Sequence, residues 1–255
     1  MRRLVTVIPA RWASTRFPGK PLCLLAGKPM LQRVWERCCR CMPMDSVYIA
    51  TDDERIFQAA KSFGAQVVHT ARTHLTGTDR VAEVAARLPE ATHIINVQGD
   101  EPVLDLYLLH RLVRALHDSN HLKMITAATP FPKFADPNDP HMVKVVINSQ
   151  GYALYFSRSA IPFAQHEGDR PHRLLHIGIY GFEKAFLLKF VSWKTSPLEQ
   201  WEKLEQLRAL ENGVQIQVLL TQHASIGVDI PSDVKKAEEI LHAEHRLDNA
   251  FWKAS

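Results

Sequence analysis

The chain has 255 residues and a mass of 29.0 kDa, a length that α/β domains commonly have. Hydrophobic residues make up 46% and charged residues 23%, which excludes disorder as the main state because such a chain can bury a core. The formal net charge of +4 permits an anionic substrate and gives no reason to expect nucleic acid as a partner.

The same composition argues against membrane insertion, because no apolar run reaches the ~18 residues that a spanning helix needs. The short apolar start, Leu4–Pro9, is interpreted as a first strand instead of a signal peptide, so a cytoplasmic protein is expected. Cys38 and Cys41 form a C-x-x-C pair without a second pair. Reduced, partly buried thiols are the favoured interpretation, with a metal or redox role as the alternative.

In the first half of the chain, strand-like and helix-like segments alternate. The patterns predict strands at 4–9, 46–50, 66–69 and 92–97, and helices at 29–41, 52–63, 78–88 and 106–116. A capping box at Thr51–Glu54 is expected to open the second helix, and Gly64 to end it. This alternation is typical of βαβ units and therefore of a parallel sheet.

The second half changes character after a short Pro-rich stretch, Thr129–Pro140. Strands at 143–147 and 152–156 flank Asn148–Gly151, which is a hairpin signal. Further strands are predicted at 174–180 and 214–220, and helices at 183–191, 196–212 and 232–247, the second of these as one long helix opened by a capping box. We therefore predict a single mixed α/β domain over residues 1–255. Its central sheet would be mostly parallel and flanked by helices, with an antiparallel excursion after about residue 140.

The loop after the first strand is the first candidate site. It carries the cations Arg11, Arg16 and Lys20, together with the hydroxyls of Ser14 and Thr15. Ligands of open α/β sheets bind beyond the carboxyl ends of strands, and clustered cations suit a polyphosphate. The loop lacks the spacing of a Walker A motif, and a solvated basic loop is the alternative interpretation.

Two acidic positions also follow strands. Asp100 comes after the strand at 92–97, where it is either part of a turn or a ligand of a hard cation that bridges phosphates. Asp229 stands between a strand and the last helix. Ser232 and Asp233 are better placed to cap that helix, which leaves Asp229 as a second carboxylate for the metal.

The order of the motifs resembles that of the 3-deoxy-manno-octulosonate cytidylyltransferases, also called CMP-Kdo synthetases. The resemblance runs from about residue 4 to about residue 240. It rests on the blocks Pro9–Leu22, Ala50–Asp52, Gly77–Arg80, Val97–Pro102, Ala153–Pro162, His176–Tyr180, Leu204–Arg208 and Gly227–Asp229. Asp79 departs from the pattern, because Glu is expected there, and Trp12 stands where Tyr is commoner.

The resemblance implies a nucleotide-diphospho-sugar transferase-like fold and a reaction in which CTP and Kdo give CMP-Kdo and pyrophosphate for lipopolysaccharide synthesis. The Kdo anomeric hydroxyl would attack the α-phosphorus in line. The resemblance also implies a homodimer, and it implies that Asp100 and Asp229 bind Mg²⁺. The expected catalytic residues are Asp100, Asp229, Arg11 and Lys20. The expected nucleotide-binding residues are Arg11, Ser14, Thr15, Arg16, Lys20, Thr78 and Arg80, and the expected sugar-binding residues are Gln98, Arg158, His176, Tyr180, Glu205 and Gln206.

Chemistry agrees with these roles, because a planar Arg pairs with a carboxylate and His, Tyr, Glu and Gln bind hydroxyls. Alternatives stay open for several residues: a core histidine at position 176, packing at Tyr180, and a solvated helix face at Glu205 and Gln206. Two other functions remain as alternatives. One is a related enzyme for sialate or an amino-substituted Kdo, and the other is a non-catalytic nucleotide-binding module.

Overall fold

The computed structural model describes residues 2–13, 17–119, 121–166, 171–222 and 227–254, and from residue 245 onward the backbone only. The chain groups into two compact units, each assembled from segments far apart in the sequence. We call residues 5–89, 96–109 and 225–255 the nucleotide-side unit, and residues 1–4, 90–95 and 110–224 the sugar-side unit, after most of the predicted residues that each contains; Gln98, predicted for the sugar, is the exception.

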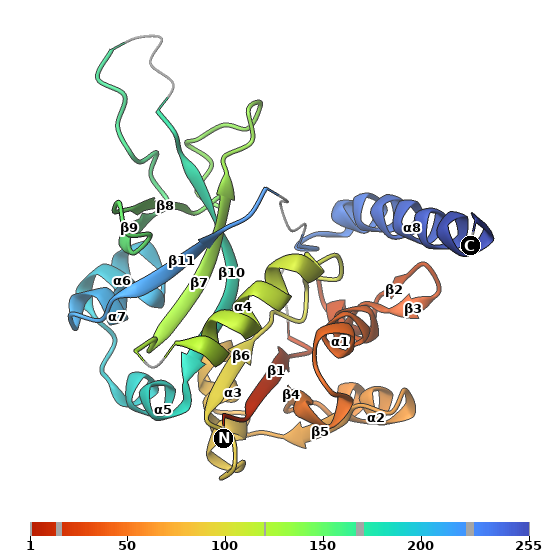
Figure 1. Cartoon of the computed structure of the whole chain (residues 1–255). Coiled ribbons are helices and arrows are strands. Elements are labelled where there is room, and N and C mark those ends of the chain that lie inside the picture. Colours follow the sequence, from red (N-terminus) through yellow and green to blue (C-terminus); the bar gives the residue numbers. More distant parts are fainter. Residues whose placement is uncertain (1, 14–16, 120, 167–170, 223–226, 255) are drawn as a thin grey trace. The chain divides into compact units, whose positions relative to one another are not determined.

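The nucleotide-side unit has the predicted alternation of strands and helices (Figure 1). Its strands β1 (Leu4–Ala10), β4 (Val47–Thr51) and β5 (Gln66–His69) are parallel, with Thr6 opposite Val47 and Tyr48 opposite Gln66. Its helices are α1 (Met30–Cys41), α2 (Glu54–Ser62), α3 (Gly77–Ala86) and α8 (Pro231–Ala254). A short hairpin of β2 (Leu24–Leu25) and β3 (Lys28–Pro29), which the sequence patterns did not reveal, precedes α1.

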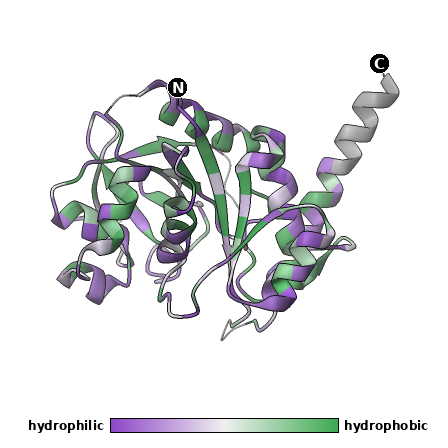
Figure 2. Cartoon of the chain, turned by 90° about the horizontal axis from the view of Figure 1, so that it is seen from below, coloured by the Kyte–Doolittle hydropathy of each residue, from purple (hydrophilic) through white to green (hydrophobic). Residues whose placement is uncertain are grey.

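Strands β1 and β4 bury apolar side chains, and the helices bury one face each. Val5, Val7 and Ile8 of β1 are almost fully buried, as are Leu31 and Val34 of α1. Figure 2 shows the result: the strands are mostly hydrophobic, while the helices carry hydrophilic residues as well. The observed strands and helices confirm the α/β class predicted from the sequence. Burial of apolar surface drives the packing of the helices on the sheet.

Two helix starts differ from the sequence prediction. The predicted box at Thr51–Glu54 is wrong, because Thr51 ends β4 and the Asp53 side chain instead accepts a hydrogen bond from the Arg55 N–H. Helix α3 has the capping box: Thr76 Oγ1 accepts from the Asp79 N–H, and the Asp79 carboxylate accepts from the Thr76 N–H. Asp79 therefore has a local structural task, which a shorter carboxylate than Glu performs well.

The sugar-side unit contains the antiparallel strands. Strand β10 (Leu174–Glu183) pairs antiparallel with β7 (Met124–Pro130), and β11 (Ile216–Leu220) pairs parallel with β7. The predicted hairpin is confirmed as β8 (Lys144–Ile147) and β9 (Ala153–Ser157), so the antiparallel excursion after about residue 140 is real. The unit also holds most of β6 (His93–Asn96) and of α4 (Leu106–Asp118), and all of α5 (Lys184–Ser192).

One predicted helix of the sugar-side unit is in fact two. The segment 196–212 forms α6 (Pro197–Glu202) and α7 (Gln206–Glu211), because Lys203 adopts the left-handed conformation with φ of 53°. This conformation costs an L-residue about 1–2 kcal/mol, and it ends the helical run at Lys203. The opening half of the prediction holds, since the Glu199 carboxylate accepts a hydrogen bond from the Ser196 N–H.

Two further expectations concern the membrane and the cysteines. Among the described residues, no helix is long and apolar enough to cross a bilayer. All four cysteines are free thiols, and burial raises the pKa of each, that of Cys39 to about 11. Thiols that stay protonated are poor metal ligands and nucleophiles, which favours the structural interpretation of this cluster.

Candidate functional site

In the nucleotide-side unit, three segments meet at the carboxyl end of β1. A Cβ added to Gly99 would lie 2.8 Å from the Pro9 carbonyl oxygen, so only glycine permits this close approach. A Cβ on Gly77, at the start of α3, would lie 3.4 Å from Pro9 Cγ and 3.9 Å from Gln98 Oε1. The residues after β6 and the start of α3 thus flank the end of β1, where ligands of such folds bind.

Lys20 joins the two acidic residues singled out in the sequence. Its Nζ lies 2.6 Å from Asp100 Oδ2 and 3.5 Å from Asp229 Oδ1. The Lys20 side chain is 12% exposed, whereas those of Asp100 and Asp229 are 33% and 53% exposed. Two carboxylates from distant parts of the sequence therefore converge on one cation at a place that a solute can reach.

The backbone around Asp229 is held by hydrogen bonds. The Val228 N–H donates to the Asp100 carbonyl at 2.9 Å, which ties the two acidic segments together. Asp233 Oδ2 accepts from the N–H groups of Asp229 and Ile230, at 3.0 and 3.1 Å. Asp233 thus caps the start of α8, as one of the two residues expected there, and the Asp229 carboxylate points to Lys20 instead.

The pair Asp100 and Asp229 suits a hard divalent cation. Mg²⁺ takes one or two carboxylates from the protein and completes its shell with water and substrate phosphates. Within the part of the chain that the structure describes, no group of three or more His, Cys, Asp or Glu side chains could hold a metal by itself. The donor set therefore fits an ion that arrives with a phosphate ligand better than a closed structural site.

The other residues predicted for the nucleotide have different surroundings. Arg11 is exposed in the loop after β1, and Ser14, Thr15 and Arg16 lie outside the described residues. Thr78 and Arg80 are buried in α3. The Arg80 guanidinium pairs with Asp52 at 3.1 Å and donates to the Thr70 hydroxyl, so it is committed to protein partners in this structure.

In the sugar-side unit, an irregularity in β10 gathers two predicted residues. The register against β7 shifts between Ile177 and Tyr180, so that Gly178 and Ile179 have no partners in the ladder. Four residues of regular strand would separate His176 from Tyr180 by about 13 Å. The bulge instead brings their ring centroids to 5.5 Å, on one side of the strand.

His176 is neutral in this setting. Burial lowers its pKa to about 3, and its Nε2 lies 2.9 Å from the Thr126 hydroxyl. That hydroxyl donates to the Ile179 carbonyl at 2.8 Å, so His176 Nε2 carries the proton and donates to Thr126 Oγ1. His176 Nδ1 is then an acceptor. The core-histidine alternative fits in part, because this ring is hydrogen-bonded and also partly exposed.

Tyr180 and the start of α7 complete this cluster. Burial, and secondarily the nearby Glu205 carboxylate, raise the pKa of the Tyr180 hydroxyl, which therefore stays protonated and can donate. Gln206 is only 3% exposed, and its Nε2 is buried without a hydrogen-bond partner. The alternative of a solvated helix face is thus wrong for Gln206. A buried donor without an acceptor is costly and calls for an explanation.

Arg158 has partners that the sequence did not indicate. Its Nε donates to the Glu202 carbonyl at 2.6 Å, and its Nη1 to the Pro140 carbonyl at 2.6 Å. Its Nη2 lies 3.4 Å from the Lys203 carbonyl. The guanidinium thus ties the end of β9 to the turn that precedes α7. Direct pairing with a substrate carboxylate stays a prediction, and the geometry supports a positioning role.

Two contributors to the site escaped the sequence patterns. Thr126 sets the tautomer of His176, and it lies in β7, which was not predicted because its apolar run shows no alternation. Gly99 was visible only as part of a Gly-Asp turn. An apolar run flanked by turn residues at 124–130 was the available signal for β7.

Comparisons with known proteins show the family to which the chain belongs. A family model described as cytidylyltransferase matches residues 5–216, which defines the class of protein. The 3-deoxy-manno-octulosonate cytidylyltransferase of Geobacter sulfurreducens is 46% identical over 248 residues, covering 93% of this chain and 99% of the relative. That of Myxococcus xanthus is 45% identical over 241 residues, covering 94% and 97%. The chain therefore belongs to the 3-deoxy-manno-octulosonate cytidylyltransferase family.

Solved structures support the same assignment. The structure of CMP:2-keto-3-deoxy-manno-octonic acid synthetase complexed with CTP aligns with a TM-score of 0.88 and 38% identity, covering 95% of this chain and 99% of that one. The 4-diphosphocytidyl-2C-methyl-D-erythritol synthase from Anaerococcus prevotii is 13% identical with a TM-score of 0.64, a likeness of fold alone. The nucleotidyltransferase-like fold expected from the sequence is thus confirmed.

Proposed function

We propose that this protein transfers the cytidylyl group of CTP to 3-deoxy-manno-octulosonate, giving CMP-Kdo and pyrophosphate. The observation that carries the proposal is the convergence of Asp100 and Asp229 on Lys20 at the carboxyl end of β1. Relatives that bear the name of this activity match nearly the whole chain, which supports the same reaction here.

In this reaction the protein contributes mainly by positioning the substrates and by stabilising negative charge, without forming a covalent intermediate. The anomeric oxygen of Kdo forms a bond to the α-phosphorus as the bond from that phosphorus to pyrophosphate breaks. Lys20 and the exposed Arg11 place positive charge where the charge of the leaving pyrophosphate grows. Arg16, Ser14 and Thr15 are proposed to add donors to the same phosphates.

Asp100 and Asp229 are the residues that would hold Mg²⁺. The bound ion would neutralise phosphate charge and favour ionisation of the attacking hydroxyl. Lys20 contacts both carboxylates, so its ammonium reduces their mutual repulsion and keeps them convergent. Asp233 fixes the backbone of Asp229, and the hydrogen bond from Val228 to the Asp100 carbonyl holds the two segments in register.

The sugar is proposed to bind the predicted residues of the sugar-side unit, and Gln98 of the other unit stays a prediction from the family resemblance. Kdo carries one carboxylate and many hydroxyls. The Tyr180 hydroxyl and Gln206 Nε2 are donors, and His176 Nδ1 and the Glu205 carboxylate are acceptors. A substrate oxygen on Gln206 Nε2 would satisfy the donor that lacks a partner. Thr78 and Arg80 are proposed to shape the nucleotide side from α3, since their side chains are buried.

We further propose that the enzyme acts as a homodimer in the cytoplasm and that its product enters lipopolysaccharide synthesis. These three statements rest on the family to which the chain belongs. Sedimentation of the purified protein tests the dimer, and a single species of monomer mass would contradict it.

The deciding experiment measures pyrophosphate release from CTP. Release is expected only when Kdo and Mg²⁺ are both present, and chelation of the metal should stop it. An amino-substituted Kdo and sialate, tested at equal concentration, should give lower kcat/KM. Higher kcat/KM with either sugar would overturn Kdo as the substrate, and release without any sugar would overturn the transfer reaction.

A further inference from the structure

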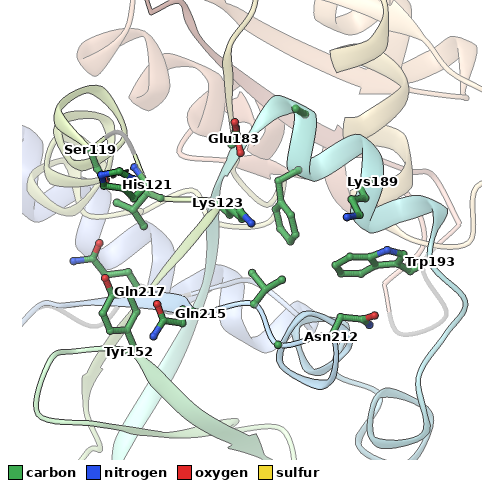
Figure 3. Close-up of a pocket in the computed structure, with 15 residues that line it drawn as sticks. Ser119, His121, Lys123, Tyr152, Glu183, Lys189, Trp193, Asn212, Gln215 and Gln217 are labelled. Carbon is green, nitrogen blue, oxygen red and sulfur yellow. Dashed lines mark hydrogen bonds between the residues drawn. The ribbon is translucent and has the colours of Figure 1, made fainter.

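The sugar-side unit contains a cavity of about 760 Å³ that none of the predicted site residues lines (Figure 3). Its walls come from the starts of β7 and β11, the end of β10, helix α5 and the residues after α7. Glu183 lies three residues after Tyr180 on β10, so the cavity begins about 10 Å along the strand from the nearest predicted sugar-binding residue. Its volume is in the range of small-molecule sites.

The charged groups of the cavity favour an anion. Lys123, Lys189 and His121 line it, with His121 and Lys189 on different sides in Figure 3. Glu183 is the one carboxylate among the lining residues in the described part of the chain. Two permanent cations against one carboxylate leave an excess of positive charge, which a phosphate or carboxylate group would neutralise.

The uncharged groups favour a planar ring with polar edges. Trp193 and Tyr152 stand on different sides of the cavity in Figure 3 and offer aromatic surface. The side-chain amides of Asn212, Gln215 and Gln217 also line it, and each amide offers both donors and an acceptor. Amides beside an aromatic wall can recognise the edge of a nucleobase, while the lysines hold the phosphate.

We propose that this cavity is a second ligand site, which binds a mononucleotide. A mononucleotide has the three features that the lining residues match: a planar base, polar base edges and a phosphate. An inorganic anion alone would use the lysines and leave the aromatic and amide surface without a partner.

The cavity is joined to the predicted sugar-binding residues by a short helix and by packed rings. Helix α7 begins with Gln206, and the residues directly after it, Asn212 and Gly213, line the cavity. Ring contacts also run without interruption from Trp193 to His176. The centroid distances are 5.8 Å for Trp193 to Phe186, 6.5 Å for Phe186 to Phe182, 5.9 Å for Phe182 to Tyr180 and 5.5 Å for Tyr180 to His176.

A ligand that moves Trp193 or the end of α7 would therefore act on residues proposed to hold the sugar. We expect a bound mononucleotide to change the KM for Kdo several-fold while the KM for CTP changes less. This expectation rests on the proposed function, whereas binding in the cavity does not.

The test is calorimetric titration of the full-length protein with AMP in the presence of saturating CTP. The variants are Lys123→Met with Lys189→Met, and Trp193→Leu. The matched control is Lys194→Met, an exposed lysine next to Trp193 that does not line the cavity. We expect one AMP per chain with a Kd of about 10 μM to 1 mM, weakened at least ~10-fold in both cavity variants and unchanged in the control.

Two results support the site and two overturn it. AMP binding that depends on the lysines and on Trp193 supports it. So does a CTP stoichiometry of two per chain that falls to one in the lysine variant, because CTP would then fill the cavity itself. No AMP binding together with one CTP per chain overturns the proposal, as does nucleotide binding that the cavity variants leave unchanged. Binding of AMP with no change in the KM for Kdo overturns only the coupling.

Discussion

In the nucleotide-side site, the charged side chains interact with one another, and backbone contacts hold them in place. Lys20 is largely buried and touches both carboxylates, while the carboxylates keep enough exposure to meet a solute. The support comes from the backbone: Gly99 permits the contact with Pro9, and Asp233 fixes the N–H groups of residues 229 and 230. Loss of a charge should therefore affect turnover more than folding.

Replacement of Asp100 or Asp229 by Ala should lower kcat at least ~100-fold with Mg²⁺ present. A single carboxylate no longer fixes the ion that the phosphates need. The melting temperature should change little, because partly exposed carboxylates contribute about 0.5 kcal/mol or less to stability. The matched control is Asp45→Ala, at an exposed position in the same unit, which should keep both rate and stability. Near-normal Mg²⁺-dependent rates in both variants would contradict the metal assignment.

Replacing Gln206 should affect substrate binding without lowering the stability of the protein. Its buried Nε2 has no partner, so Gln206→Met, which keeps the shape, should leave the melting temperature unchanged or raise it. If this nitrogen binds Kdo, the same change should raise the KM for Kdo about tenfold, which corresponds to about 1.4 kcal/mol. The KM for CTP should stay constant.

The control for that measurement is Gln200→Met on the exposed side of α6, where the amide donates to the Thr195 carbonyl. This variant should leave both Michaelis constants unchanged. A drop in the stability of Gln206→Met with an unchanged KM for Kdo would mean that Gln206 is structural.

At the scale of elements, the turn between α6 and α7 decides where Glu205 and Gln206 lie. Lys203 breaks what the sequence presents as one helix, and the carbonyls of Glu202 and Lys203 then face Arg158. Helix α7 is only six residues long, so it draws little stability from its own hydrogen bonds. Its place depends on Arg158 on one side and on the buried pair of Arg208 and Glu199 on the other.

Arg158→Lys should therefore lower stability by about 1–3 kcal/mol and raise the KM for Kdo. Lysine keeps the charge and loses the planar fork that reaches several carbonyls at once. Urea unfolding and Kdo titration at saturating CTP would measure the two effects. Arg114→Lys, at an exposed position on α4, is the matched control and should change neither. A higher KM for Kdo with unchanged stability would instead indicate direct contact between Arg158 and the substrate carboxylate.

At the scale of the whole molecule, stability depends on pH through the neutral His176. Its pKa in the folded protein is about 3, below the ordinary value of 6.5, because burial disfavours the charged ring. Between these two values the unfolded chain binds more protons than the folded one. The stability contributed by the neutral ring is thus fully present above pH 6.5 and is lost as the pH falls toward 3.

We expect His176 to lower the free energy of unfolding by about 1–2 kcal/mol between pH 6.5 and 4.5. This is less than the pKa shift alone would give, because the ring is partly exposed to solvent. His176→Gln keeps a donor for Thr126 and cannot titrate, so it should lose that much less stability over the same interval. Urea unfolding of both proteins at several pH values is the measurement. Parallel pH dependences for the two proteins would show that His176 is not the residue responsible.

The sequence by itself determined the α/β class, most strands and helices, and the two acidic positions, because these depend on local patterns. Alternating burial, capping residues and glycines act within a few residues of the chain. The motif order also pointed to the cytidylyltransferase family. It did not reveal β7, whose apolar run carries no alternation and whose partners, β10 and β11, come 44 or more residues later in the chain.

Only the tertiary structure decided how these parts work together. It brought Asp100 and Asp229 to one ammonium group, committed Arg80 and Arg158 to protein partners, and buried Gln206 without an acceptor. It also divided the helix at 196–212 and formed a cavity between elements that are unrelated in sequence. Such features depend on distances between residues far apart in the chain, and these distances follow from packing, which no local pattern encodes.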